Sequence, residues 1–419
     1  SASRLHKKRD GRNHLEKSLT FWGHLTFSNY DGGKIIFGIN DQGSVVGVND
    51  PEKGCLDIEN KINDSIRPQP DYTLEVTEEK TIILEIYAGN KKPYLYKSKA
   101  YKRNDTATIE ADTLEVTRLI LEGRNRSYEE LPSDVQNLNF SILEDKLIRE
   151  TGIDSCDTNI LKTLNLYSDE TGYNIAAAIL ADENIYPGID IGRFGESISI
   201  IKTRKTFQHC SALALYDSAC EMFNDYYEYD VIKGTTRKTV KSIPEEAFRE
   251  TIANALIHRV WDVKEHIRIF MFDDRIEVFS PGGLPARLSK DAYLSGNYSN
   301  LRNPILSNVF YRLKIVEIFG TGIRRIKEAY LDSITKPEFE VYDNQIKVIL
   351  PILEAKNTLQ GDEAVVYEAL SEVEGKAMSE ILKSIPFGKS KTRIILQDLV
   401  SRKLVYVKGT GRGTKYYRM

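Results

Sequence analysis

The sequence predicts an α+β protein of several domains, and three observations lead to that prediction. The chain has 419 residues, too many for one ordinary hydrophobic core, so about two to four domains are expected. Strand-like runs alternate with helical patterns along most of the chain, and the polar stretch 353–363 interrupts them as a linker would. With 41% hydrophobic and 28% charged residues, the composition is that of an ordinary globular protein.

Four regions are expected in order. Residues 1–125 combine a helix with strand-like runs around the turn-forming glycines of "DGGKIIFGIND". A mainly helical connector follows at 126–240. Residues 241–354 begin with an amphipathic helix, continue with two strands and glycine-rich loops, and end with a helix and a strand. The last region, 362–419, contains three short helical patterns and a basic β-hairpin.

Charge and cysteine content exclude several classes of protein. The formal net charge of −3 gives no overall attraction to nucleic acid, so any such binding must come from a local patch. The four cysteines have no C-x-x-C spacing, so neither a zinc site nor a disulfide framework is expected. We find neither an apolar run of the roughly 18–20 residues that span a bilayer nor a secretory signal, so no membrane partner and a cytoplasmic location are expected.

The stretch "FRETIANALIHR", residues 248–259, places unusual side chains on one helical face. Glu250, Asn254 and His258 are four residues apart and therefore lie along one line of a helix, while the opposite face is apolar. A surface helix normally carries long, well-hydrated charges on its outer face. A carboxylate, an amide and an imidazole in this arrangement instead indicate a site.

Three more motifs follow this helix in order: "DDRIEVFSPGGLP", "RNPILSNVF" and "VEIFGTGIRRI". Together they resemble the GHKL ATPase fold, an α/β sandwich. The resemblance is to its divergent branch related to a DNA-helicase C-terminal domain, which is found in Schlafen-related prokaryotic regulators. The match covers residues 243–352 and is specific because separated motifs occur in the same order.

That resemblance implies ATP, or a related nucleotide, and Mg²⁺ as cofactors. Asn254 would coordinate Mg²⁺, and Glu250 would position or deprotonate the attacking water. His258 is either on the ligand side or an ordinary helix histidine. The other expected nucleotide-binding residues are Gly282, Gly283, Arg302, Asn303, Gly320, Thr321 and Gly322. Ser280 stands where the family usually has the adenine-binding Asp, which leaves adenine selectivity open, and a weak ATPase activity also stays open.

In the first region, "FSNYDGGKIIFGINDQGSVVGV" resembles the Schlafen AlbA-2 domain. Nuclease members of that family bind metal through upstream carboxylates, but here that segment reads "RLHKKRD". Without clustered carboxylates, nuclease activity is not expected. Lys102 and Arg103 lie among tyrosines and other basic residues, which indicates either nucleic-acid binding without cleavage or a solvated edge strand.

The C-terminal region resembles a winged helix-turn-helix. Its amphipathic helix, 388–403, would turn Ile394, Ile395, Leu396, Leu399 and Val400 toward a core. Residues 376–419 contain eleven Lys and Arg against two acidic residues, a net charge of +9. Such a domain can bind double-stranded DNA or a protein, and the charge favours DNA. The residues expected to read the major groove are Lys389, Ser390, Lys391, Thr392 and Arg393, and those expected to hold phosphate are Arg412 and Lys415.

These expectations combine into a nucleotide-responsive, DNA-binding transcriptional regulator. Nucleotide occupancy would alter a lid at 285–303 and so the placement of the winged helix. The alternative is an ATPase of DNA repair or phage defence that uses DNA binding for recruitment. The sequence leaves a homodimer open.

Overall fold

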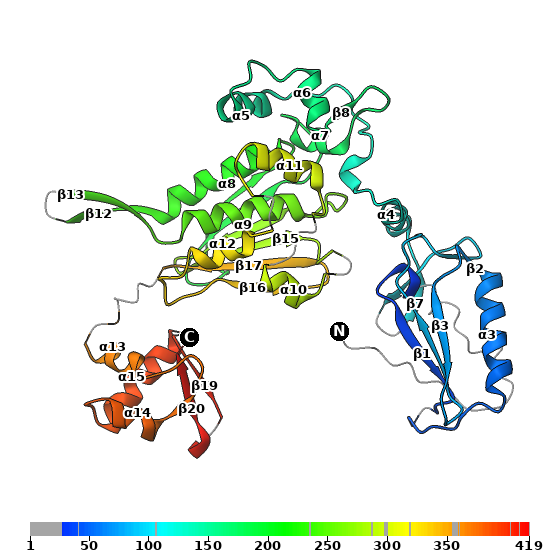
Figure 1. Cartoon of the computed structure of the whole chain (residues 1–419). Helices are drawn as coiled ribbons and strands as arrows, with labels where there is room; N and C mark the ends of the chain where they lie inside the picture. Colours follow the sequence, from blue (N-terminus) through cyan, green and yellow to red (C-terminus); the bar gives the residue numbers. More distant parts are fainter. Residues whose placement is uncertain are drawn as a thin grey trace. The chain divides into compact units, whose positions relative to one another are not determined.

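The computed structural model describes residues 27–40, 42–104, 107–233, 236–285, 288–296, 301–317, 320–353, 359, 361–402, 404–409 and 411–418. The chain divides into two compact units, Ser1–Leu131 with Pro285–Ser289, and Pro132–Leu284 with Lys290–Met419 (Figure 1). Within the described ranges, none of the helices has the length and apolar character needed to cross a membrane. The mixed α+β, multidomain class expected from the sequence is confirmed.

The first unit contains a three-stranded antiparallel sheet with the order β1-β4-β3, formed by Gly33–Phe37, Ile82–Ile86 and Tyr72–Val76. Helix α3 (Pro51–Ser65) begins with a proline, and the Asp50 side chain caps it by accepting from the amide of Lys53. The buried residues Ile58 and Ile62 of α3 join the core formed by the sheet. The remaining elements are β2 (Ile66–Arg67), β5 (Leu95–Tyr96), β6 (Tyr101–Asn104), β7 (Ala107–Glu110), α4 (Thr113–Gly123) and the 3₁₀ turn η1 (Tyr128–Glu130).

A six-stranded sheet organises the second unit, in the order β11-β10-β14-β15-β17-β16. These strands are Ile201–Phe207, Ile189–Phe194, Ile267–Met271, Arg275–Pro281, Gln345–Pro351 and Glu338–Val341. All neighbours are antiparallel except β10 and β14. Parallel neighbours require a long connection, and here it includes helices α8 (Ala212–Tyr227) and α9 (Glu245–His258), which lie over the sheet (Figure 1).

The sheet extends beyond the boundary expected at residue 241. Strands β10 and β11 and helix α8 all lie inside the range expected to be a helical connector, 126–240. The reason is long-range: β10 pairs with β14, which comes much later in the chain, so no local pattern marks β10 as part of this sheet. The other elements of that range are α5 (Ser141–Thr151), α6 (Thr158–Thr163), β8 (Tyr167–Ser168), β9 (Gly172–Tyr173), α7 (Ile175–Leu180), and the hairpin β12 (Glu228–Lys233) and β13 (Thr236–Lys241).

Helix α9 is buried on several sides, not on one face only. It contacts β15 and β17 of the sheet, and also α8, α11 (Pro304–Arg312) and α12 (Gly322–Glu328). Phe248 of α9 stacks on Phe223 of α8, with ring centroids 4.4 Å apart and an interplanar angle of 13°. Short helix α10 (Lys290–Ser295) completes the unit's secondary structure before the C-terminal region. Side chains at Glu250 and Asn254 therefore lie between packed elements.

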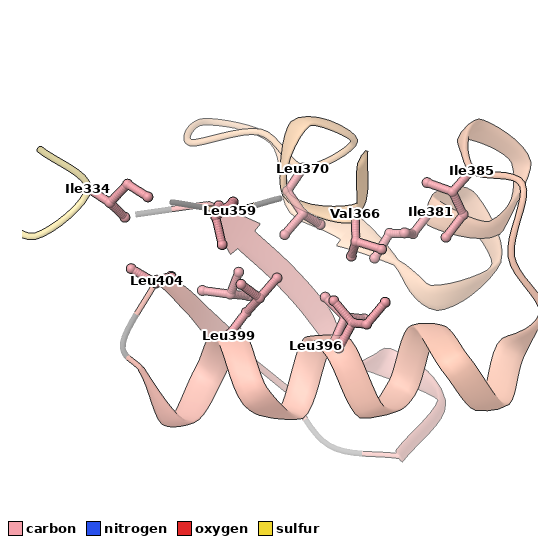
Figure 2. Close-up of a cluster of buried hydrophobic side chains, with 11 residues drawn as sticks. Ile334, Leu359, Val366, Leu370, Ile381, Ile385, Leu396, Leu399 and Leu404 are labelled. Carbon is pink, nitrogen blue, oxygen red and sulfur yellow. The ribbon is translucent and has the colours of Figure 1, made fainter. Parts of the chain in front are cut away.

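The C-terminal region has three helices and a small antiparallel sheet, ordered β18-β20-β19. Its elements are α13 (Asp362–Glu368), β18 (Lys376–Ala377), α14 (Met378–Ser384), α15 (Lys389–Ser401), β19 (Val405–Lys408), the 3₁₀ turn η3 (Gly411–Gly413) and β20 (Lys415–Arg418). Leu396 and Leu399 point from α15 into a core with Val366 and Ile381 (Figure 2). One expected core residue differs: Ile394 is 68% exposed, because the helix turns Ile395 toward the core and Ile394 away from it.

Candidate nucleotide site and nucleic-acid surfaces

Glu250 and Asn254 contact each other on α9, as their four-residue spacing predicts. Asn254 Nδ2 donates to Glu250 Oε1 at 3.2 Å. The other carboxylate oxygen lies 3.8 Å from Arg325 Nη1 on α12, and Arg325 Nη2 lies 3.3 Å from Glu317 Oε1. Burial raises the pKa of the Glu250 carboxyl group, while Arg325 and Asn254 oppose that change. The site thus holds a buried carboxylate beside an amide and a shared guanidinium.

The glycine motif that begins α12 lies directly against this pair. A Cβ added to Gly322 would be 2.4 Å from Glu250 Oε1 and 2.6 Å from Asn254 Nδ2, so a larger residue there would have to displace the ends of both side chains. Gly320 has a positive φ of 64°, which also favours glycine, and Thr321 lies between the two. The structure therefore brings Gly320, Thr321 and Gly322 to the helix that carries Glu250 and Asn254.

This donor set is compatible with a magnesium–nucleotide complex. Since Asn254 Nδ2 donates to Glu250, Oδ1 is the atom through which its amide would bind a cation. Among the described residues, no group of three His, Cys, Asp or Glu side chains could hold a metal ion by itself. Phosphate oxygens and water would have to supply the other ligands, which is how Mg²⁺ is commonly held in nucleotide sites.

His258 is the last residue of α9 and is half-buried. Burial and the nearby Arg302 guanidinium lower the pKa of this imidazole to about 4. The ring is therefore neutral at neutral pH. A neutral imidazole offers a phosphate one N–H donor and no charge, so both alternatives for His258 stay open.

The side chains of Arg302 and Asn303 contact the C-terminal end of α9. Arg302 donates from Nη1 to the carbonyl of His258 and from Nη2 to that of Gly283, both at 2.9 Å. The buried Asn303 amide donates to the carbonyls of Ile257 and Arg259, at 2.6 and 2.9 Å. The bonds to α9 and to Arg259, which follows it, satisfy carbonyls that the end of a helix leaves without an internal partner, and the bond to Gly283 joins a loop to the same place. Both side chains thus have structural partners where nucleotide contacts were expected.

Packing also accounts for Gly282 and Gly283. A Cβ on Gly282, whose φ is +104°, would lie 2.6 Å from Arg302 Nη1, and one on Gly283 would lie 2.3 Å from the carbonyl oxygen of Asp343. Ser280 Oγ donates to the carbonyl of Ala255 at 3.1 Å. The loop is therefore fixed against its neighbours by contacts that need no nucleotide.

Sequence reasoning did not single out Arg325. The signal was present, because Arg325 lies three residues after Gly322 and so on the same face of α12. Since Gly322 and Glu250 were expected at the same site, a side chain on the Gly322 face of α12 could have been expected near Glu250.

In the C-terminal region, the residues expected to bind DNA have different environments. Lys389, Ser390, Lys391 and Arg393 are exposed on α15, and Lys415 is exposed on β20. Thr392, by contrast, is fully buried, and its hydroxyl donates to the carbonyl of Gly388 at 3.0 Å. Unlike the other expected residues of α15, it therefore has no surface with which to contact a base. The side chain of Arg412 lies outside the described part.

In the first unit, acidic residues neutralise much of the expected basic surface. Lys102 Nζ lies 3.6 Å from Asp112 Oδ2, and Lys99 Nζ lies 2.7 Å from Glu110 Oε2. The Arg103 side chain and the basic segment 4–10 lie outside the described residues. The ion pairs favour the edge-strand alternative over a phosphate-binding surface for these lysines.

Two known families match parts of this chain, one in the first region and one in the region of the six-stranded sheet. Residues 264–350 match the family described as "Putative ATP-dependent DNA helicase recG C-terminal", and residues 8–112 match "Schlafen, AlbA_2". The chain carries both domains. Strands β14, β15 and β16 and all of β17 but Pro351 lie inside the RecG-C-terminal-like match, whereas α9, with Glu250 and Asn254, lies just before it.

Among solved structures, the DIP2311 protein of Corynebacterium diphtheriae is similar over 99% of this chain and 88% of its own, with 18% identity and a TM-score of 0.50. At that identity the likeness concerns the fold alone. The N-terminal domain of a putative ATP-dependent DNA helicase RecG-related protein from Nitrosomonas europaea is 23% identical over 27% of this chain and 82% of that chain, with a TM-score of 0.20. A comparison with curated proteins gave no match.

Proposed function

We propose that this protein is a nucleotide-responsive, DNA-binding transcriptional regulator that binds ATP, or a related nucleotide, with Mg²⁺. One observation carries the nucleotide part: Gly322 of the glycine motif lies so close to the Glu250–Asn254 pair that a Cβ there would displace both side-chain ends. The motif on α9 and the glycine motif at the start of α12, both of which a nucleotide site needs, are therefore adjacent. The match of the following strands to an ATPase-type family supports the same conclusion.

Each residue of the site has a proposed task. Asn254 Oδ1 would be a ligand of Mg²⁺, and Gly320 and Gly322 would let the backbone approach the phosphates. When bound, Mg²⁺ would neutralise phosphate charge. Arg325, with its guanidinium shared between two carboxylates, would gain a phosphate oxygen as a further partner.

The DNA-binding part of the proposal rests on the C-terminal region. Its order of elements, helix, strand, helix, helix and two strands, supports the proposal of a winged helix, and its segment 376–419 has a net charge of +9. Helix α15 would enter the major groove, and the hairpin β19–β20 would lie along the phosphates. Nucleotide can regulate DNA binding only if the C-terminal region takes up two placements and the protein's affinity for nucleotide differs between them.

Glu250 supports the alternative of an ATPase that DNA binding recruits to its place of action. A buried carboxyl group with a raised pKa is suited to accept a proton from water. Turnover that duplex DNA stimulates would favour this alternative, whereas tight binding without turnover would favour the regulator.

Calorimetry with Mg²⁺ and a non-hydrolysable ATP analogue tests the proposal. Asn254→Ala should abolish Mg²⁺-dependent binding without unfolding the protein, because Asn254 is a partly exposed amide that donates a hydrogen bond to a neighbour on its own helix, Glu250. Asn60→Ala removes an exposed amide from α3 and is the matched control. Unchanged affinity in Asn254→Ala would refute the assignment.

A further inference from the structure

The exposed face of α15 forms a defined stripe. Ser390, Arg393, Ile394 and Gln397 are all exposed and follow the helical spacing i, i+3, i+4, i+7, so they share one face. Lys391 points elsewhere, because its ammonium group forms an ion pair with Asp362 of α13 and lies 4.8 Å from the ring centroid of Phe387. Among the described residues, neither Lys389 nor Arg393 forms an ion pair.

Ile394 is the unusual member of this stripe. It is 68% exposed, although the same helix has a buried side formed by Ile395, Leu396 and Leu399. A single exposed aliphatic residue is ordinary on a surface. Here, however, it stands between a guanidinium and a carboxamide in the middle of the helix that the region's positive charge would direct toward DNA.

The chemistry of the stripe matches base edges in the major groove. Arginine donates two hydrogen bonds to O6 and N7 of guanine, glutamine pairs with N6 and N7 of adenine, and an aliphatic group contacts the 5-methyl of thymine. At 1.5 Å per residue, positions 390 to 397 span roughly 10 Å, or about three base pairs at 3.4 Å each. The stripe is therefore long enough to read one short half-site.

We propose that this stripe reads base identity, with Ile394 packed on a thymine methyl group between bases contacted by Arg393 and Gln397. The inference rests on the proposed DNA binding and adds to it the residues that set specificity. The occupant is double-stranded DNA and not an apolar protein surface, because Ile394 belongs to segment 376–419, whose net charge is +9. Lys389, one residue before the stripe, would contact phosphate.

Thymine-to-uracil exchange tests the role of Ile394, since it removes only the methyl group. Preferred duplexes are selected from a random pool with the full chain, and each thymine is then replaced in turn. One position should lose about fourfold in affinity, the value of one buried methyl-sized group. In Ile394→Ala the same exchange should have no effect. Val373→Ala, at a residue that is 91% exposed in the same region but outside α15, should keep the fourfold loss.

The outcomes separate this inference from the function on which it rests. If selection gives a preferred sequence but no thymine position responds, or Ile394→Ala still discriminates thymine from uracil, the role of Ile394 is refuted while DNA binding stands. Should the full chain bind no duplex, or bind all duplexes alike, the proposed sequence-specific DNA binding fails and the inference fails with it. Arg393→Ala gives a second readout, the loss of preference at one guanine.

Discussion

Substitution of Gly322 by alanine tests whether the glycine motif and α9 form one site. The added methyl group would lie 2.4 Å from Glu250 Oε1 and 2.6 Å from Asn254 Nδ2, whereas non-bonded contacts to carbon are normally about 3.5 Å or longer. Both side-chain ends must therefore move by about 1 Å. Flexible side chains can make this movement without unfolding their surroundings, and alanine favours the helix by up to about 1 kcal/mol over glycine.

Gly322→Ala should therefore separate stability from binding. The free energy of unfolding is expected to change by no more than about 1–2 kcal/mol, because the cost of overpacking and the gain in helix propensity oppose each other. Nucleotide affinity should fall by about 10- to 100-fold, the value of one or two displaced contacts to a charged ligand.

Urea denaturation and calorimetry with Mg²⁺ and the ATP analogue measure the two quantities on the same samples. Gly413→Ala is the matched control, because a Cβ at Gly413 meets no atom within 4 Å and its φ lies outside the positive range. Wild-type nucleotide affinity in Gly322→Ala would show that α12 does not contribute to the site, and the assignment would fall.

Three further predictions concern other residues. Glu250→Gln should keep nucleotide binding and remove any hydrolysis. Because the folded-state pKa of Glu250 is raised, the wild-type protein should lose stability as pH rises from the ordinary glutamate pKa to the folded-state pKa. A urea-denaturation series over pH should show this loss in the wild type and not in the variant. Arg302→Ala should lower the free energy of unfolding by about 1–3 kcal/mol, because it leaves two carbonyls unsatisfied. It also removes a positive charge near His258, so the pKa of His258 should rise in an NMR titration. Wild-type stability in the variant would contradict the structural role of Arg302. Truncation after residue 355 should remove most duplex affinity and reduce the slope of log K against log salt by about one for each lost phosphate contact; an unchanged slope would redirect attention to residues near 100.

Local features of the site were predictable from sequence. The contact between Glu250 and Asn254 follows from helical spacing, and the approach of Gly320–Gly322 follows from a known order of motifs. The partners of Arg302 and Asn303 were not predictable, because they depend on where the end of α9 lies relative to a loop more than forty residues later.

Helix register explains the errors in the C-terminal region. An amphipathic pattern shows that one side of α15 is buried, but adjacent residues are about 100° apart around a helix. A small rotation therefore decides that Thr392 is buried and Ile394 exposed. Strand β10 was missed for a different reason, since a parallel partner far along the chain leaves no local pattern.

The parallel pairing of β10 with β14 also constrains how the protein is made. Ile189 pairs with Ile267, so β10 leaves the ribosome well before the strand that completes its hydrogen bonding. Pairs this distant in sequence form slowly, because a long loop must close first. During synthesis, the edge of β10 that pairs with β14 therefore stays without its partner strand while α8 and α9 emerge. A recombinant fragment that starts at residue 241 would lack β10, so the unpaired edge of β14 would be exposed and prone to aggregation.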